Sequence, residues 1–165
     1  MNKDELRAIQ KPIKDRYRED PTAAMITLRA EGSLSDDDVA CSVQTGRALV
    51  EAGLHPATGG TGMLACSGDM LLQALVACAG VTLRSVATNR SLAVTGTLRA
   101  EGDLDFQGTM GTNADAPVGF TAIRLFFDIE SDAPKEDIDA LIETTEKYCV
   151  VFQTLANGVR PSLHR

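Results

Sequence analysis

Residues 70–86 read MLLQALVACAGVTLRSV, and this stretch decides most of the fold. Apolar residues take most positions in it, and Gln73, Arg84 and Ser85 interrupt it. A helix that is apolar all round is buried on all sides, so we expect a central core helix over residues 69–86. The stretch is too short and too interrupted to predict a membrane span.

Cys78 lies in the middle of this predicted helix, beside Ala77, Ala79 and Gly80. A thiol in such a place is usually inert packing, because free cysteine behaves as a small hydrophobe. However, Gly80 costs about 1 kcal/mol relative to alanine inside a helix, which suggests that something needs the space. A closely packed helix and a small substrate both satisfy that need.

A second cysteine helix is predicted to begin at Pro134 and to end near Gly158, where a C-terminal cap is expected. Cys149 lies on its inward stripe, whose members follow three- and four-residue steps: Ile138, Leu141, Ile142, Thr145, Cys149, Phe152 and Leu155. Two core helices in one small domain must nearly touch. The sequence leaves open whether their two sulfurs come within disulfide range.

The N-terminal segment differs from the rest in its high charge of both signs. Leu6, Ile9 and Ile13 form a thin apolar stripe that predicts a helix over residues 2–19. We expect Pro12 to kink this helix and Pro21 to end it. The resulting domain prediction is a helical appendage over residues 1–20 and a main domain over residues 21–165.

The remaining segments predict an α+β fold with an antiparallel sheet, because strands, a helix, more strands and a helix follow one another. TLRAEG occurs at residues 27–32 and again at 97–102, which we interpret as two strands that end in similar Glu-Gly turns. Residues 36–38 are expected at a hairpin tip. Residues 53–62 are expected to form a loop with His55 in solvent. The predicted strands are 23–30, 39–43, 47–52, 91–98, 104–110 and 120–129.

The composition of the 165 residues excludes several classes of function. A net charge of -7, 4% aromatic residues and no Trp argue against a nucleic-acid partner. Two His and no CxxC pattern predict no metal or other cofactor. The charged N-terminus lacks a secretory signal core, so we expect a cytoplasmic protein without a membrane partner. The four cysteines are Cys41, Cys66, Cys78 and Cys149, and we interpret the first two as bystanders.

Two stretches together resemble the OsmC/Ohr family of thiol peroxidases. They are GGTGMLACSGDMLLQALVACAGVTLRSVA at residues 59–87 and TTEKYCVVFQTLANG at residues 144–158. The resemblance runs from about residue 47 to residue 163 and is carried mainly by the two cysteine motifs, in this order and spacing. It implies an OsmC-like fold with two antiparallel sheets around two central helices. It also implies an intertwined homodimer with active sites at the subunit interface.

The resemblance further implies the roles of three site residues. Cys78 corresponds to the peroxidatic thiol and Cys149 to the resolving thiol. An arginine from the first hairpin lowers the thiol pKa in the family, and Arg29 is the best match here, with Arg47 second. The implied activity is reduction of organic hydroperoxides through a sulfenate and then a disulfide, with an external dithiol as reductant.

Two departures from the family pattern keep other functions open. Gly68, followed by Asp69, stands where the family often has a glutamate, and Val150-Val151-Phe152 stands where many members have Pro-Val-Ser. These changes favour an alternative: a dimer without enzymatic activity that binds a small apolar ligand, with inert thiols. A third possibility is a module that docks on a partner through residues 1–20.

Overall fold

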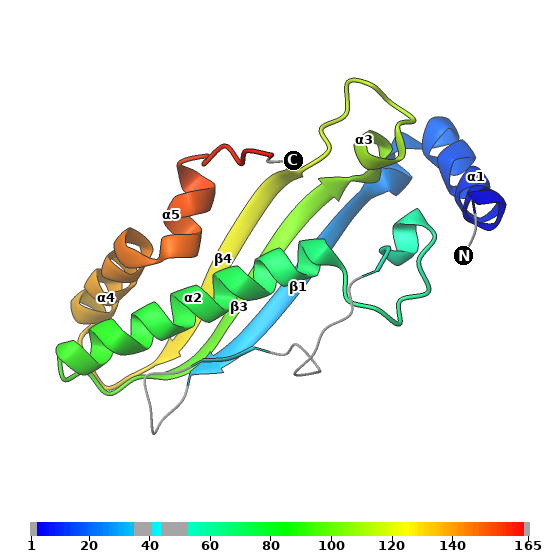
Figure 1. Ribbon diagram of the computed structural model, residues 1–165. Coiled ribbons are helices and arrows are strands. Elements are labelled where there is room, and N and C mark those ends of the chain that lie inside the picture. Colours follow the sequence, from blue (N-terminus) through cyan, green and yellow to red (C-terminus); the bar gives the residue numbers. More distant parts are fainter. Residues whose placement is uncertain (1–2, 35–40, 44–52, 164–165) are drawn as a thin grey trace. The chain divides into compact units, whose positions relative to one another are not determined.

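The computed structural model describes residues 3–34, 41–43 and 53–163 (Figure 1). Helices and strands are both present, as the α+β prediction requires. The α-helices are α1 Lys3–Glu19, α2 Ser67–Asn89, α3 Phe106–Met110, α4 Lys135–Tyr148 and α5 Val150–Ala156, with short 3-10 helices η1 Pro21–Ala24 and η2 Pro56–Thr58. The strands are β1 Met25–Leu34, β2 Cys41–Val43, β3 Thr95–Asp105 and β4 Phe120–Glu130.

The four strands of the described ranges form one sheet in the order β2-β1-β3-β4. β1 and β2 pair antiparallel, with Gly32 opposite Val43. β3 and β4 are also antiparallel: Gly96 lies against Asp128 at one end, and the Thr121 hydroxyl donates to the Asp103 carbonyl at the other, at 3.1 Å. The second sheet that the resemblance implies stays a prediction.

The predicted Glu-Gly turns are wrong, because both copies of TLRAEG lie inside strands. β1 continues through Glu31 and Gly32 to Leu34, and β3 continues through Gly102 to Asp105. A Cβ atom on Gly102 would lie 2.4 Å from Cε1 of Phe120. Glycine at this position therefore makes room for an aromatic ring from the neighbouring strand and does not form a turn.

Two predicted strands also begin or end differently. The strand predicted over residues 91–98 starts only at Thr95, because Ser91 has a positive φ of 57° in the turn that follows α2. The strand predicted over 104–110 is wrong: the Asp105 side chain accepts the Gln107 N–H at 2.9 Å and caps the short helix α3. The predictions for residues 36–38 and 47–52 lie outside the described residues.

The chain divides into two compact units. The first contains α1, η1, η2 and α3. Tyr17 of α1 is only 2% exposed, and its hydroxyl donates to the Ala57 carbonyl at 2.7 Å. Within this unit α1 packs against η2 and α3. The division of the chain at residue 20 stays a prediction.

The second unit contains most of α2 with α4, α5 and the adjoining ends of β3 and β4. One cluster of its core consists of Leu83 and Ala87 from α2, Val94, and Leu141 from α4, all buried. The partly buried side chains of Val86, Leu92, Phe127, Ile129 and Ile138 surround them. Since these apolar groups leave water together, α2 and α4 are held against each other, as their stripes predict.

The prediction that α2 is buried on all sides is wrong. Leu72, Leu75 and Leu83 are buried, whereas Leu71 is 37% exposed and Val81 is 40% exposed. Among the described residues, α2 is a helix long and apolar enough to cross a membrane by length and composition. Its buried leucines are those of a core helix.

Replacing Leu83 by alanine is expected to lower the free energy of unfolding by about 2–5 kcal/mol, since it removes buried contacts and leaves a cavity. Urea denaturation followed by circular dichroism measures this change. Leu163→Ala is the matched control, because Leu163 is 95% exposed. Equal effects of the two substitutions would contradict the assignment of the core.

Candidate thiol site

Cys149 lies where the predicted long helix is interrupted. The helix over residues 134–158 is in fact two helices, because Cys149 has extended backbone angles of φ -71° and ψ 107°. Its N–H donates to the Thr145 carbonyl at 2.8 Å at the end of α4. Its sulfur accepts the Phe152 N–H at 3.5 Å and so caps the start of α5. Gly158, with a φ of 60°, follows the end of α5 as predicted.

The structure brings the two predicted thiols together within the second unit. Cys149 is buried, and Cys78 on α2 is half-buried. The pKa of Cys149 is raised to about 11: burial is the largest cause, a hydrogen bond with the Cys78 side chain adds to it, and the Phe152 N–H opposes both effects. Cys149 therefore keeps its proton at neutral pH.

A cavity of about 230 Å³ lies against Cys149. It is lined by Ala79 of α2, by Leu125 and Phe127 of β4, by Ile142, Thr145, Glu146 and Cys149 around α4, and by Phe152 of α5. The Thr145 hydroxyl donates to the Leu141 carbonyl at 2.8 Å, so its polar group is satisfied within the helix. The cavity is smaller than a typical site for a drug-sized ligand and suits a small apolar group.

The other predicted site residues are only partly described. Arg29 lies on β1, but its side chain is outside the described parts of the structure, as is the whole of Arg47. Cys66 is half-buried just before α2, in the first unit, where its carbonyl accepts the Met70 N–H at 3.0 Å. Cys41 begins β2. Over the described ranges, no group of three His, Cys, Asp or Glu side chains could hold a metal ion.

His55 has structural surroundings that sequence reasoning missed, and its charge acts on Asp69. His55 was predicted in solvent, but its ring stacks on Phe106 with the ring centroids 5.0 Å apart. Its Nδ1 accepts the Ala57 N–H at 3.0 Å and caps η2. Burial raises the pKa of Asp69 in the first turn of α2, and the charge of His55 opposes this effect.

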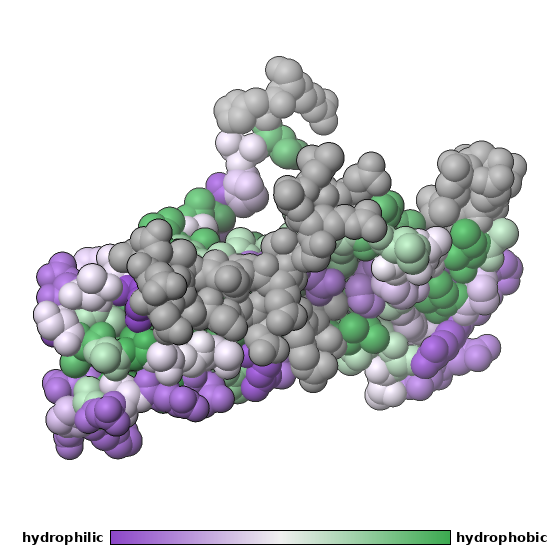
Figure 2. Space-filling model, turned by 90° about the horizontal axis from the view of Figure 1, so that it is seen from below, coloured by the Kyte–Doolittle hydropathy of each residue, from purple (hydrophilic) through white to green (hydrophobic). Residues whose placement is uncertain are grey.

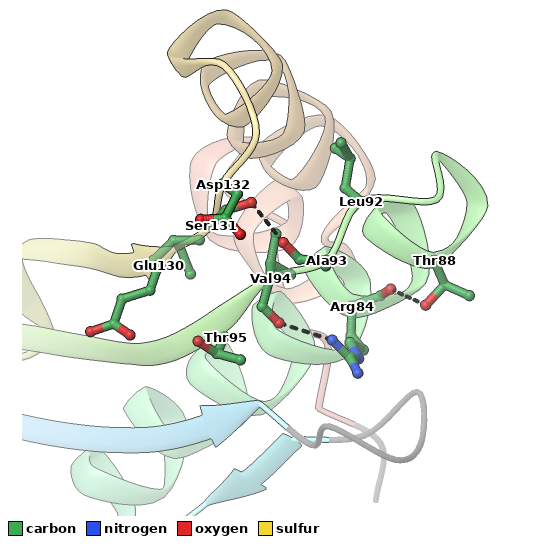
Figure 3. Close-up of a pocket in the computed structure, with 10 residues that line it drawn as sticks. Arg84, Thr88, Leu92, Ala93, Val94, Thr95, Glu130, Ser131 and Asp132 are labelled. Carbon is green, nitrogen blue, oxygen red and sulfur yellow. Dashed lines mark hydrogen bonds between the residues drawn. The ribbon is translucent and has the colours of Figure 1, made fainter.

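A second, more open pocket of about 810 Å³ lies where α2 ends, β3 begins and β4 ends (Figure 3). Arg84 donates to the Val94 carbonyl at 3.0 Å, and the Ser131 hydroxyl donates to the Ala93 carbonyl at 2.6 Å. These polar groups hold the connection between α2 and β3. Sequence reasoning missed this pocket, because its polar residues form no motif.

The fold and the site define an α+β protein with two neighbouring thiols beside an apolar cavity. The sequence model of a family described as OsmC-like protein matches residues 60–164, and the chain belongs to this family. Its fold is similar to that of an OsmC-like hydroperoxide resistance protein from Jannaschia sp. CCS1, with a TM-score of 0.54 and 17% identity over 85% of this chain and 91% of that one. No curated protein compared with the chain matches it.

Alkylation with iodoacetamide is expected to show that Cys149 is protected in the native protein. Because its pKa is raised to about 11, its thiolate fraction should rise about tenfold per pH unit from pH 7 up to that value. Peptide mapping at several pH values measures the rate at each cysteine. In denaturant, the alkylation rate of Cys149 should have the pH midpoint of an ordinary thiol. The same midpoint in the native protein would contradict the argument that burial raises the pKa of Cys149.

Proposed function

We propose that this protein is a thiol peroxidase that reduces organic hydroperoxides by a two-cysteine mechanism. The observation that carries the proposal is the meeting of Cys78 and Cys149 beside an apolar cavity. Membership of the OsmC-like family supports it. The cytoplasm, where thiol reductants are abundant, is the proposed place of action.

The different burial of the two thiols supports different roles. Cys78 is the more accessible, so its thiolate attacks the hydroperoxide. A bond forms between its sulfur and the terminal oxygen, and the O–O bond breaks. The alkoxide takes up a proton and leaves as an alcohol. Cys78 becomes a sulfenic acid, which is a two-electron oxidation.

Cys149 then acts as the resolving thiol. Its sulfur attacks the sulfur of the Cys78 sulfenic acid, and the hydroxyl group leaves with the thiol proton as water. The product is a disulfide between Cys78 and Cys149. An external dithiol reduces this disulfide by two exchange steps and becomes oxidised itself.

An apolar site raises the pKa of a thiol, so the attacking thiolate needs a nearby cation. We propose Arg29 on β1 for this role, with Arg47 as the second candidate. A guanidinium stays protonated throughout the working pH range and is therefore suited to stabilise a thiolate.

Treatment of the reduced protein with one equivalent of cumene hydroperoxide is expected to form the Cys78–Cys149 disulfide. Intact mass should fall by two hydrogens, and peptide mapping should place the link. Cys78→Ser should abolish the change, whereas Cys149→Ser should leave oxygen attached at Cys78. No reaction, or oxidation confined to Cys66 and the methionines, would sink the proposal.

A ligand-binding function without chemistry is the second candidate. Phe152, one of the departures from the family pattern, lines the cavity, and its N–H contacts the Cys149 sulfur. An aromatic wall suits the binding of an apolar molecule. The same experiment decides, because a binder would take up the apolar compound and leave both thiols reduced.

A homodimer is part of the proposal, and one face of α2 supports it. Leu71, Ala74, Cys78 and Val81 follow three- and four-residue steps, and all but the half-buried Cys78 are exposed. Apolar residues are visible on the molecular surface in Figure 2. Exposed apolar stripes mark interaction sites, and we propose that a second copy of the chain packs along this stripe and lines the site of Cys78 without closing it to substrate.

Val81→Arg is expected to weaken the dimer, because it places a charge within the proposed apolar interface. Since Val81 is 40% exposed, the fold should tolerate the substitution. Light scattering during size-exclusion chromatography measures the mass. Val118→Arg, at a valine that is 67% exposed, is the control and should leave the mass unchanged. A monomeric wild-type protein would contradict the proposal.

A further inference from the structure

Glu146 is the one charged residue among the described residues that line the cavity beside Cys149. It follows Ile142 by four residues on α4, and Thr145 and Cys149 complete the same helical face. The other lining residues carry no charge, and Cys149 keeps its proton at neutral pH. A molecule in this cavity therefore meets apolar groups and a single negative charge.

The exposure of the lining residues shows which end of the cavity lies inside the protein and which end opens to solvent. Cys149 is buried, whereas Glu146 is exposed, so the thiol lies at the inner part and the carboxylate at the mouth. In the proposed mechanism the peroxide reacts at Cys78, which is hydrogen-bonded to Cys149, so a tail that occupies the cavity beside Cys149 shares its walls with Glu146. A charged group at the end of such a tail would meet the Glu146 carboxylate at the mouth.

The polar groups around Glu146 offer little to a second carboxylate. The Thr145 hydroxyl is bonded to the Leu141 carbonyl. The Gln153 side-chain amide donates to the Glu146 carbonyl at 2.9 Å. Lys147, the adjacent cation in the sequence, lies over the ring of Tyr148, 5.4 Å from its centroid.

We propose that Glu146 makes this cavity select hydroperoxides with neutral apolar tails over hydroperoxides whose tails end in a carboxylate. The selection rests on the proposed peroxidase function. A tail carboxylate would lose part of its hydration at the apolar wall and would be repelled by Glu146. A neutral tail of the same length meets neither cost.

The test compares octyl hydroperoxide with its ω-carboxylate analogue as oxidants of the reduced full-length protein. The ratio of their kcat/KM values is measured for the wild type, Glu146→Gln and Glu146→Lys. Glu146→Gln should raise kcat/KM for the carboxylate about fivefold and leave that for the neutral compound within about twofold. Glu146→Lys should raise the carboxylate value further. Added salt should reduce the ratio of the neutral to the carboxylate kcat/KM in the wild type and have little effect on this ratio in Glu146→Gln.

Glu143→Gln is the matched control, because it removes the same charge from an exposed position of α4 that does not line the cavity. It should leave the ratio unchanged, and an equal effect of both glutamine variants would overturn the role of Glu146. NMR titration with octanol and its ω-carboxylate analogue separates this inference from the peroxidase function. Selective binding without thiol oxidation would contradict the peroxidase function but not the role of Glu146. Equal binding of both compounds to the wild type would contradict the selection by Glu146.

Discussion

The packing of α2 against α4 is the interaction on which the thiol site depends. Leu83 and Ala87 on one helix and Leu141 on the other leave water together, and this contact fixes the distance between the helices that carry Cys78 and Cys149. Ala79, next to Cys78, is buried and lines the cavity together with residues of α4. A larger side chain at Ala79 would push against α4 and is therefore expected to move the two thiols apart.

The same burial creates a conflict for a thiol enzyme, because an apolar environment favours the protonated form of cysteine. The two thiols meet this conflict differently. Cys149 is buried and keeps its proton, whereas Cys78 lies on the partly exposed face of α2. In the proposed cycle, the resolving thiol must persist until a sulfenic acid forms beside it, and burial would protect Cys149 from other oxidants. The proposed attacking thiol must meet solvent-borne substrate, and the half-exposed position of Cys78 permits that.

The sequence predicts the elements whose periodicity is strong and misses those that depend on tertiary contacts. The apolar stripes of α1 and α2 predict these helices to within a few residues, and the stripe of α4 predicts where that helix begins but not where it ends. Gly102 was misread as a turn residue, because the ring of Phe120 that requires it belongs to another strand. The break at Cys149 has no local signal, since a thiol is not among the usual helix caps. The pairing of Cys78 with Cys149 is predicted by the resemblance, because neither residue alone indicates it.

Cys149 connects three properties that are usually carried by different residues. Its backbone separates α4 from α5, its sulfur caps α5 through the Phe152 N–H, and its side chain lines the cavity with the Phe152 ring. Any change in the bonding of this sulfur therefore acts on the start of α5 and on the cavity wall at the same time. In a two-cysteine cycle, the disulfide would alter the acceptor of the Phe152 N–H just after the substrate has reacted. The redox state of the thiols and the shape of the apolar cavity are then linked through one residue, which gives Phe152 a physical connection to the chemistry at the position where this chain departs from its family.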